Sequence, residues 1–335
     1  MFCCLGLFTY AVVGIVFYMF ASYLLGLLSI GDLKNRPVFI SGCDSGFGYR
    51  LALKLLRNGA PVFAGCFTEK GEDKLKKEAR ELPGRLVTVP LNVTSQESVD
   101  KAAETVESLL KGKGLWGLVN NAGVLGANGP DEWLSVADYQ QALDVNALGV
   151  IRLTHAFKAL IKKRRGRIVT AVSVAGRVPF ALSGPYTVSK FAAGGYCDIL
   201  RQEMKVWGVS VHILEPGFFK TDLFVVEAIQ RRMKALWERC SKSVRDEWGQ
   251  HFFDWLHQSV KKQSVDKTST DVDWVVDCYY HALLSRFPKK RYHPGYDSRF
   301  FFIPVSALPT ALMDWLLELV VQRPAGAPLP AALQK

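Results

Sequence analysis

The sequence predicts an α/β protein with a doubly wound parallel sheet, an N-terminal membrane helix, and a helical C-terminal region that contacts substrate and membrane. Three observations support this prediction. Short, β-branched apolar runs alternate with longer amphipathic segments along most of the chain. A glycine-rich turn follows the first of these runs, and residues 1–31 contain no charged side chain. At 335 residues and 49% hydrophobic content, the chain is long and apolar enough for one large domain with additional segments.

The first segment, residues 1–31, has the character of a membrane anchor. The apolar run from Cys3 to Ile30 is longer than the ~20 residues needed to cross a bilayer core. Lys34 and Arg36 follow directly, which favours a cytosolic position for the rest of the chain. A cleaved secretory signal is the alternative. It is disfavoured because no basic region precedes the apolar run and because the run is too long.

Charge and cysteine content narrow the range of partners. The net charge is +11, but acidic and basic residues alternate, and the longest basic run is Lys162–Arg165. This balance favours an anionic cofactor or a lipid headgroup surface and does not by itself indicate nucleic acid. The seven cysteines are scattered without a C-x-x-C pair, which is typical of a reducing compartment. His155 and His212 are isolated from each other and from cysteine, so no metal site is expected.

Between residues 32 and 223 the alternation is regular. Strands are predicted at 36–41, 61–66, 86–91, 115–119, 167–172 and 209–214. Helices are predicted at 47–57, 72–81, 94–110, 136–159 and 186–207, the third opened by a Thr94-x-x-Glu97 capping box. Strands that alternate with helices pair in parallel through right-handed crossovers. The region is therefore predicted to be one doubly wound catalytic domain.

The turn after the first predicted strand has the properties of a dinucleotide site. It contains Gly42, Ser45, Gly46, Phe47 and Gly48, with the spacing G-x-x-x-G-x-G. Glycines at such a turn let the backbone approach a pyrophosphate, and the free N–H groups at the following helix start meet its charge. After the second strand, Glu69 could bind the ribose hydroxyls and repel a 2′-phosphate, whereas Lys70 would favour that phosphate. NAD is the preferred cofactor on this reasoning, and NADP is not excluded.

Tyr186 and Lys190 are the candidate reacting pair. Their spacing places them on one face of a helix, one turn apart. A free phenol has a pKa of about 10, and a nearby ammonium would lower this pKa toward the range of a useful base. Ser173, after the fifth strand, could hydrogen-bond the substrate oxygen, and Asn146 in the preceding helix could hold a water that connects Lys190 with solvent. A tyrosine and a lysine four residues apart are common by chance, so the argument depends on the combination of motifs.

These motifs all follow strands. The glycine turn, Asn120-Asn121-Ala122-Gly123, Ser173 and the Tyr186 pair would meet at the carboxyl ends of parallel strands. Ligands bind at that edge in open α/β sheets.

At these residues the sequence resembles the short-chain dehydrogenase/reductase family, over about Pro37 to Thr221. The glycine turn, the Asn120–Gly123 segment and the set Asn146, Ser173, Tyr186 and Lys190 match its motifs. Longer stretches at residues 42–48, 114–123 and 215–221, and Arg291–Asp297 in the tail, resemble the microsomal retinol and hydroxysteroid dehydrogenases. The mitochondrial D-3-hydroxybutyrate dehydrogenase belongs to the same branch.

The resemblance implies a Rossmann-type fold, an acid–base role for Tyr186, and a set of cofactor contacts. Tyr186 would take the hydroxyl proton, Lys190 would bind the nicotinamide ribose, and Asn146 would support a proton relay. The implied cofactor contacts are Gly42, Ser45, Gly46, Phe47, Gly48, Glu69, Asn92, Val93, Asn120, Ala122, Gly123, Tyr186, Lys190, Pro216, Gly217 and Thr221. Asn92 stands where the family usually has aspartate, which puts the adenine contact in doubt.

Residues 224–335 are predicted to form a helical substrate-pocket and membrane-associated region. Aromatic residues in the helix expected at 224–255 could form the wall of a pocket for a retinoid or steroid, although aromatics at helical spacing are also common in ordinary cores. Leu312 to Val321 could lie on a membrane surface, because acidic residues interrupt it too often for a full span.

The sequence therefore predicts an NAD-linked retinol or hydroxysteroid dehydrogenase of the endoplasmic reticulum membrane with its catalytic domain in the cytosol. One alternative is D-3-hydroxybutyrate dehydrogenase, disfavoured by the long anchor and the lack of an amphipathic leader. Another is a non-catalytic lipid-binding membrane protein with the same fold. The expected partners are a lipophilic small molecule and the membrane, and a homodimer stays open.

Overall fold

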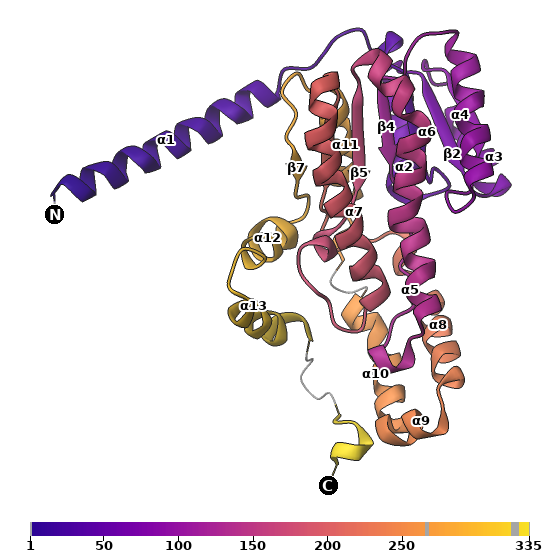
Figure 1. Cartoon of the computed structure of the whole chain (residues 1–335), viewed down its shortest axis with the longest axis vertical. Coiled ribbons are helices and arrows are strands. Elements are labelled where there is room, and N and C mark those ends of the chain that lie inside the picture. The colour runs from indigo at the N-terminus through magenta and orange to yellow at the C-terminus, as the bar shows by residue number, and fades with distance from the viewer. Residues whose placement is uncertain (1, 265–267, 323–327, 335) are drawn as a thin grey trace.

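The computed structural model describes residues 2–264, 268–322 and 328–334. Residues 1, 265–267, 323–327 and 335, which belong to the predicted segments 1–31 and 224–335, lie outside this description. A long N-terminal helix extends away from an α/β body, and a helical lobe lies at one end of that body (Figure 1).

The body is built on a parallel sheet of seven strands in the order β3-β2-β1-β4-β5-β6-β7. The strands are β1 (Val38–Ser41), β2 (Val62–Cys66), β3 (Leu86–Pro90), β4 (Gly117–Asn120), β5 (Arg167–Ala171), β6 (Ser210–Leu214) and β7 (Arg291–Tyr292). Central strands such as β1 and β4 are buried on both faces, which is why their sequences are continuous apolar runs. The order reverses between β1 and β4, and this reversal creates the crevice in which such sheets bind ligands.

Helices cover both faces of the sheet, so the prediction of a doubly wound sheet is confirmed. One face is covered by α2 (Gly46–Arg57), α3 (Glu69–Ala79) and α11 (Val272–Leu284), whose apolar residues share one core cluster. The opposite face is covered by α4 (Gln96–Leu110), α6 (Gly149–Arg164) and α7 (Gly184–Glu203). Most predicted strand and helix positions agree with these elements within two or three residues.

Three local predictions need correction. The helix expected at 136–159 is α5 (Val136–Leu143), a π-helical turn η3 (Asp144–Leu148) and then α6. Ser95, not Thr94, caps α4, since its hydroxyl accepts a bond from the Ser98 N–H while Thr94 is bonded to Asn92. The helix expected at 224–255 is three helices, α8 (Val226–Arg239), α9 (Lys242–Trp248) and α10 (Gln250–Ser264).

The C-terminal residues return to the sheet. After α10, α11 packs against α2, and β7 pairs in parallel with β6. The chain then forms the π-helical turn η7 (Ser298–Phe302), α12 (Ile303–Val305), α13 (Thr310–Leu317), η8 (Glu318–Gln322) and η9 (Ala331–Leu333). Strand β7 was not predicted, because a two-residue strand has no detectable alternation of apolar and polar residues.

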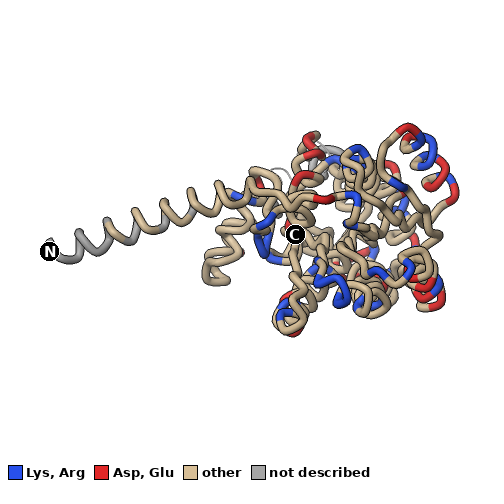
Figure 2. The backbone as a smooth tube through the Cα atoms, turned by 90° about the horizontal axis from the view of Figure 1, so that it is seen from above, with Lys and Arg blue, Asp and Glu red and all other residues tan. Residues whose placement is uncertain are grey.

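The N-terminal helix α1 (Phe2–Gly26) carries no charged residue along its length and points away from the body (Figure 2). Across the described segments, no helix combines the length and apolar character that crossing a bilayer requires. The predicted membrane-spanning anchor is therefore not confirmed. The end of α1 is fixed to the body, where Ile30 N–H donates to Leu284 O at 2.8 Å and Ser29 forms a bridge with Ser285.

Candidate active site

The glycine turn joins β1 to α2 at the carboxyl edge of the sheet. Gly42 has φ +70°, and a Cβ there would lie 2.9 Å from the Ala122 Cα. A Cβ on Gly48 would lie 2.4 Å from the Gly42 carbonyl oxygen, so both positions are restricted to glycine by close contact. At Gly46, with φ +61°, nothing lies within 4 Å of the equivalent position. The turn therefore leaves open space at the start of α2.

The start of α2 is suited to an anion. Ser45 is the N-cap residue, yet its side chain makes no capping hydrogen bond to the helix. The first N–H groups of α2 therefore have no side-chain acceptor, and the positive end of the helix dipole favours a phosphate at this place. The residues present fit the pyrophosphate of a dinucleotide.

Two residues to which the sequence analysis assigned no role, Ser41 and Asn121, hold this turn in place. The Ser41 hydroxyl donates to Val119 O at 3.3 Å and accepts bonds from the Asn121 and Ala122 N–H groups. The Asn121 amide donates to the carbonyls of Ser41 and Gly42 at 3.0 Å, and Tyr279 donates to its oxygen. These bonds fix the β1 turn to the end of β4. A polar residue at the end of an apolar strand is the only sequence signal that could have indicated this role.

The glycine turn contributes an acidic side chain, Asp44, to the region where β2 ends, and the sequence analysis assigned no role to it. The Asp44 carboxylate accepts bonds from the Phe67 N–H at 2.9 Å, and from the Thr68 N–H and hydroxyl, both at 2.7 Å. Glu69, the predicted ribose ligand, is exposed at the first position of α3. Both acids therefore lie where β2 ends, and Asp44 is the one held rigidly by the glycine turn.

The other predicted cofactor contacts lie at the same edge, but they differ in exposure. Asn92 is half-buried and its side-chain oxygen accepts from Thr94, while Val93 is buried beside Gly149. Asn120 is buried, and its amide donates to the hydroxyls of Thr154 and Thr170. Its bonds therefore connect β4 with α6 and β5.

Tyr186 and Lys190 project from α7 toward the end of β5. The Lys190 ammonium donates to Ala171 O at 3.0 Å, and its nitrogen lies 5.6 Å from the centroid of the Tyr186 ring. Ser173 follows β5, and its side chain lowers the pKa of the Tyr186 phenol. The structure thus brings these three side chains together, at the edge where the glycine turn lies.

Asn146 lies in the π-helical turn η3 and is completely buried. Its oxygen accepts from the Val124 N–H at 2.9 Å, and its amide donates to Val124 O at 2.8 Å and the Ser189 hydroxyl at 2.9 Å. The hypothetical Cβ of Gly123 lies 3.1 Å from the Asn146 oxygen and 3.6 Å from the Lys190 nitrogen. Gly123 therefore leaves room between these two side chains. A π-turn is typical of functional positions in helices.

The pKa values of the reacting pair differ from the sequence expectation. Loss of hydration raises the pKa of Tyr186 to about 12, and the hydrogen bond with Ser173 acts in the opposite direction. Loss of hydration also lowers the pKa of Lys190 to about 8. The expected lowering of the Tyr186 pKa by the ammonium was thus wrong for the protein alone, because burial raises this pKa and Lys190 is not among the groups that lower it. Ser173 is the neighbour that favours the phenolate.

The segment after β6 closes the site on its other side. Pro216 O accepts from the Val174 N–H at 3.1 Å, directly beside Ser173. The Gly217 N–H donates to Pro294 O at 3.1 Å, and the Phe218 N–H donates to the Asp297 carboxylate at 2.8 Å. A cleft of about 830 Å³ has Ser45 and Gly46 of the glycine turn and Thr221 among its lining residues. Most of the other lining residues belong to α2 and α11, and Tyr186, Lys190 and Ser173 are not among them, so the cleft joins the start of α2 to Thr221 outside the reacting group.

A cluster of aromatic residues lies beyond the reacting pair. Trp133 packs against Trp237, with ring centroids 4.9 Å apart, and Trp237 stacks on Phe253 at 5.1 Å. Half-buried side chains that contact this cluster include Leu182, Tyr186 and Phe224. The cluster is contributed mainly by α8 and α10, which form the lobe at the lower end of Figure 1. The apolar wall thus extends from the lobe to the candidate catalytic tyrosine.

The sequence model described as short chain dehydrogenase matches residues 36–231, more than half of the chain. The chain belongs to the short-chain dehydrogenase family. A 3beta-hydroxysteroid dehydrogenase of Caenorhabditis elegans is 45% identical over 96% of this chain and 84% of its own length. The human 17-beta-hydroxysteroid dehydrogenase type 6 is 42% identical over 89% of this chain and 92% of its own. Rat retinol dehydrogenase 7 is 41% identical over the same shares.

These relatives place the short-chain dehydrogenase described here in the retinol and hydroxysteroid branch and show that it is an enzyme of the alcohol dehydrogenase type. Solved structures agree on the fold. A short-chain dehydrogenase from Streptomyces avermitilis superimposes with a TM-score of 0.64 at 23% identity, covering 85% of this chain and 95% of that chain. Levodione reductase gives 0.63 at 18% identity, covering 79% and 98%.

Proposed function

We propose that this short-chain dehydrogenase transfers hydride between NAD(H) and the alcohol or carbonyl group of a lipophilic substrate, retinol or a hydroxysteroid. The observation that carries the proposal is the meeting of Tyr186, Lys190 and Ser173 at the sheet edge that also holds the glycine turn. Relatives named as hydroxysteroid and retinol dehydrogenases supply the substrate class. Structural neighbours with bound NADP or a derivative support a nicotinamide dinucleotide.

The chain's own residues perform the acid–base work. In the oxidation, the Tyr186 phenolate takes the proton of the substrate hydroxyl, and the Ser173 hydroxyl hydrogen-bonds the same oxygen. Bound nicotinamide supplies the hydride acceptor. The Lys190 ammonium stabilises the phenolate when the tyrosine loses its proton and binds the nicotinamide ribose. Asn146 and the space beside Gly123 support a proton path from Lys190 to solvent.

The aromatic cluster supports an apolar substrate. Leu182 and Phe224 belong to the same apolar group as Tyr186, so a substrate hydroxyl at Tyr186 would place its carbon skeleton against these side chains. Pockets for apolar ligands are lined mainly by hydrophobic and aromatic residues with few polar groups. A small acid such as 3-hydroxybutyrate would leave most of this surface uncovered.

Two acidic residues support NAD over NADP. Asp44 and Glu69 both lie at the end of β2, the position at which such folds recognise the adenosine ribose. A 2′-phosphate placed there would meet two carboxylates, and its negative charge would be repelled. Lys70 is the one feature of the turn that favours NADP.

We further propose that the protein is associated with the endoplasmic reticulum membrane, with the catalytic body in the cytosol. The uncharged segment 1–31 supports membrane contact, and exposed apolar side chains in the C-terminal region, including Phe300, Trp315 and Leu319, offer a second contact. Helices α12 and α13 lie on the side of the body toward which α1 extends (Figure 1).

A substrate panel tests the proposal. All-trans retinol, androstanediol and 3-hydroxybutyrate are offered with NAD and with NADP, and Tyr186→Phe serves as the variant without the acid–base group. We expect NAD-dependent turnover of retinol or androstanediol and a fall in kcat of about 100- to 10,000-fold in Tyr186→Phe. Turnover of 3-hydroxybutyrate alone would favour the D-3-hydroxybutyrate dehydrogenase alternative. Unchanged turnover in Tyr186→Phe would contradict the assigned chemistry, and no turnover of any alcohol would favour a non-catalytic lipid-binding protein.

A further inference from the structure

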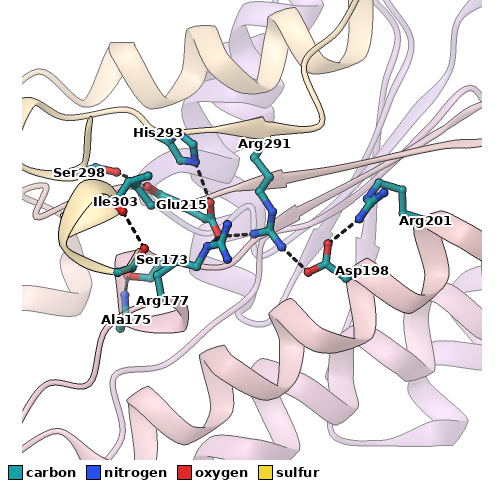
Figure 3. Close-up of polar contacts among 11 residues, drawn as sticks. Ser173, Ala175, Arg177, Asp198, Arg201, Glu215, Arg291, His293, Ser298 and Ile303 are labelled. Carbon is teal, nitrogen blue, oxygen red and sulfur yellow. Dashed lines mark hydrogen bonds and ion pairs between the residues drawn. The ribbon is translucent and has the colours of Figure 1, made fainter. Parts of the chain in front are cut away.

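Glu215 is a completely buried carboxylate directly after β6, and it lies beside the candidate active site without taking part in the proposed chemistry. Its side chain has three basic neighbours (Figure 3). Arg177 lies 2.9 Å from one carboxylate oxygen and Arg291 also contacts that oxygen, while His293 lies 2.9 Å from the other oxygen. Burial of a carboxylate costs free energy of desolvation, and ion-pair partners offset much of this cost, so the cluster by itself is weak evidence for a role in stability.

The first partner connects Glu215 with Ser173. Arg177 is the C-cap residue of the 3-10 turn η4 (Val174–Gly176), and Ser173 is the N-cap residue of that same turn. The Ser173 oxygen accepts a bond from the Ala175 N–H at 3.1 Å within the turn. The Arg177–Glu215 pair therefore holds the far end of the short turn whose beginning presents the Ser173 hydroxyl.

The second partner connects Glu215 with the helix of the reacting pair. Arg291 contacts both Glu215 and Asp198 with its two terminal nitrogens. Asp198 lies in α7, two helical turns after Lys190. Arg291 thus links the end of β6 to the helix that carries Tyr186 and Lys190.

The backbone of Glu215 continues into the segment that closes the site. The Glu215 N–H donates to Tyr292 O, and Glu215 O accepts from the Ser298 hydroxyl, both at 2.8 Å. The next residue, Pro216, is bonded to Val174 beside Ser173. A shift of Glu215 would therefore move the Pro216–Gly217 backbone and the Ser173 turn together.

We propose that Glu215 is a positioning residue, which aligns the Ser173 turn, the Tyr186 helix and the Pro216–Gly217 segment through Arg177 and Arg291. Arg291, His293 and Ser298 lie beyond residue 231, where the match to the family's sequence model ends. The C-terminal segment thus contributes to the geometry of an active site whose chemical groups all come from the family domain. This inference rests on the proposed roles of Ser173 and Tyr186.

The decisive variants are at Arg177, because its side chain is 36% exposed and its replacement leaves the core intact. Arg177→Met removes the charge, Arg177→Lys keeps it, and Arg201→Met is the matched control. Arg201 pairs with Asp198 in the same group of side chains but, in the described part of the chain, does not contact Glu215. Glu215→Gln is the fourth variant. All are compared in the full chain by kcat, KM, pH profile and thermal midpoint.

We expect Arg177→Met to lower kcat by about ten- to 100-fold, because small displacements of reacting groups have effects of this size. We also expect the pH profile of oxidation to move to higher pH, since Ser173 is the neighbour that lowers the pKa of Tyr186. Arg177→Lys should recover most of the activity, and Arg201→Met should stay within about twofold of the unchanged protein, as surface pairs contribute little. The thermal midpoint of Arg177→Met should fall only slightly, because Arg291 and His293 remain as partners of the Glu215 carboxylate.

Wild-type kcat and pH profile in Arg177→Met would overturn the proposal, and so would an equal loss in Arg201→Met. If Glu215→Gln does not fold, the Arg177 series decides alone. If the unchanged protein oxidises no alcohol, the proposed function has failed. The positioning role is then tested separately by measuring NADH binding through its fluorescence. A dissociation constant raised at least about fivefold in Arg177→Met would support that role, and an unchanged constant would overturn it.

Discussion

At the scale of single residues, the end of β2 shows how two like charges can have different roles. Asp44 is fixed by three hydrogen bonds from Phe67 and Thr68, whereas Glu69 projects from the exposed start of α3. A rigid charge cannot move away from an incoming phosphate, but an exposed glutamate can rotate into solvent. Asp44 is therefore expected to contribute more to the discrimination between NAD and NADP.

Replacing each acid in turn tests this difference. Asp44→Ser removes the fixed charge, and we expect the ratio of kcat/KM for NADP to that for NAD to rise at least about tenfold, equivalent to about 1.4 kcal/mol. Glu69→Gln is the matched control and should change the ratio much less, because its side chain is not held in place. Steady-state kinetics with both dinucleotides measure the ratio. A larger shift in Glu69→Gln would assign the discrimination to Glu69, as the sequence alone predicted.

His212 gives the fold a dependence on pH that is separate from catalysis. Burial in β6 lowers the pKa of His212 to about 3, and the nearby Arg167 and Lys290 act in the same direction, while the hydrogen bond with Lys289 O opposes them. The unfolded chain takes up a proton below about pH 6.5, whereas the folded chain does not. The contribution of neutral His212 to the free energy of unfolding is therefore complete above pH 6.5. It declines by about 1.4 kcal/mol per pH unit as the pH falls toward 3.

Comparing the unchanged protein with His212→Gln isolates this contribution. Between pH 7 and pH 5, we expect the free energy of unfolding to fall more steeply in the unchanged protein than in His212→Gln, since glutamine does not titrate. Denaturant unfolding at a series of pH values measures the two slopes. Parallel slopes would show that His212 is protonated in the folded protein over this range.

At the scale of elements, the predictable part of the structure is the part governed by local periodicity. The strands β1 to β6 and the helices between them follow from apolar runs and amphipathic spacing, and the glycine turn follows from its position between β1 and α2. The π-turn at Asn146, the cap at Ser95 and the strand β7 depend on contacts between distant residues. Likewise, only contacts in the folded structure identify the supporting roles of Ser41, Asn121, Asp44 and Glu215.

Glycines in two helices provide an element-scale prediction. A Cβ on Gly48 in α2 would lie 2.5 Å from the Asn121 amide nitrogen as well as 2.4 Å from Gly42 O, and neither atom belongs to a flexible chain end. Overpacking of this kind costs about 1–3 kcal/mol, so Gly48→Ala should lower the thermal midpoint and weaken dinucleotide binding at least about fivefold. Gly195→Ala in α7 is the control, because nothing lies within 4 Å of its Cβ position.

This control variant should raise helix stability by about 0.5–1 kcal/mol and leave dinucleotide binding unchanged. Equal binding in both variants would mean that the α2 turn does not hold the cofactor.

At the scale of the whole molecule, the segment before the family domain is joined to the segment that follows this domain. Gly26 O and Leu28 O accept bonds from Ser285 and Arg286 just after α11, and α11 packs on α2, the helix that begins at the glycine turn. β7 follows and leads into the contacts with Glu215. The segment that precedes the family domain and the segment that follows it therefore stabilise the cofactor helix and the site-closing segment from the outside.

This arrangement determines how the membrane proposal should be tested. Deleting residues 2–25 removes most of α1 but keeps Gly26 to Ile30, which contact Leu284 and Ser285. We expect this truncated protein to move from the membrane fraction to the supernatant on sedimentation and to keep its thermal midpoint. Deleting residues 2–31 should release the protein equally but lower the midpoint, because the Ser285 hydroxyl and the end of α11 lose their partners. Persistent membrane binding after both deletions would assign the membrane contact to the exposed apolar side chains of residues 300–320. Release of both proteins with the same thermal midpoint would show that the contacts of residues 26–30 contribute no stability.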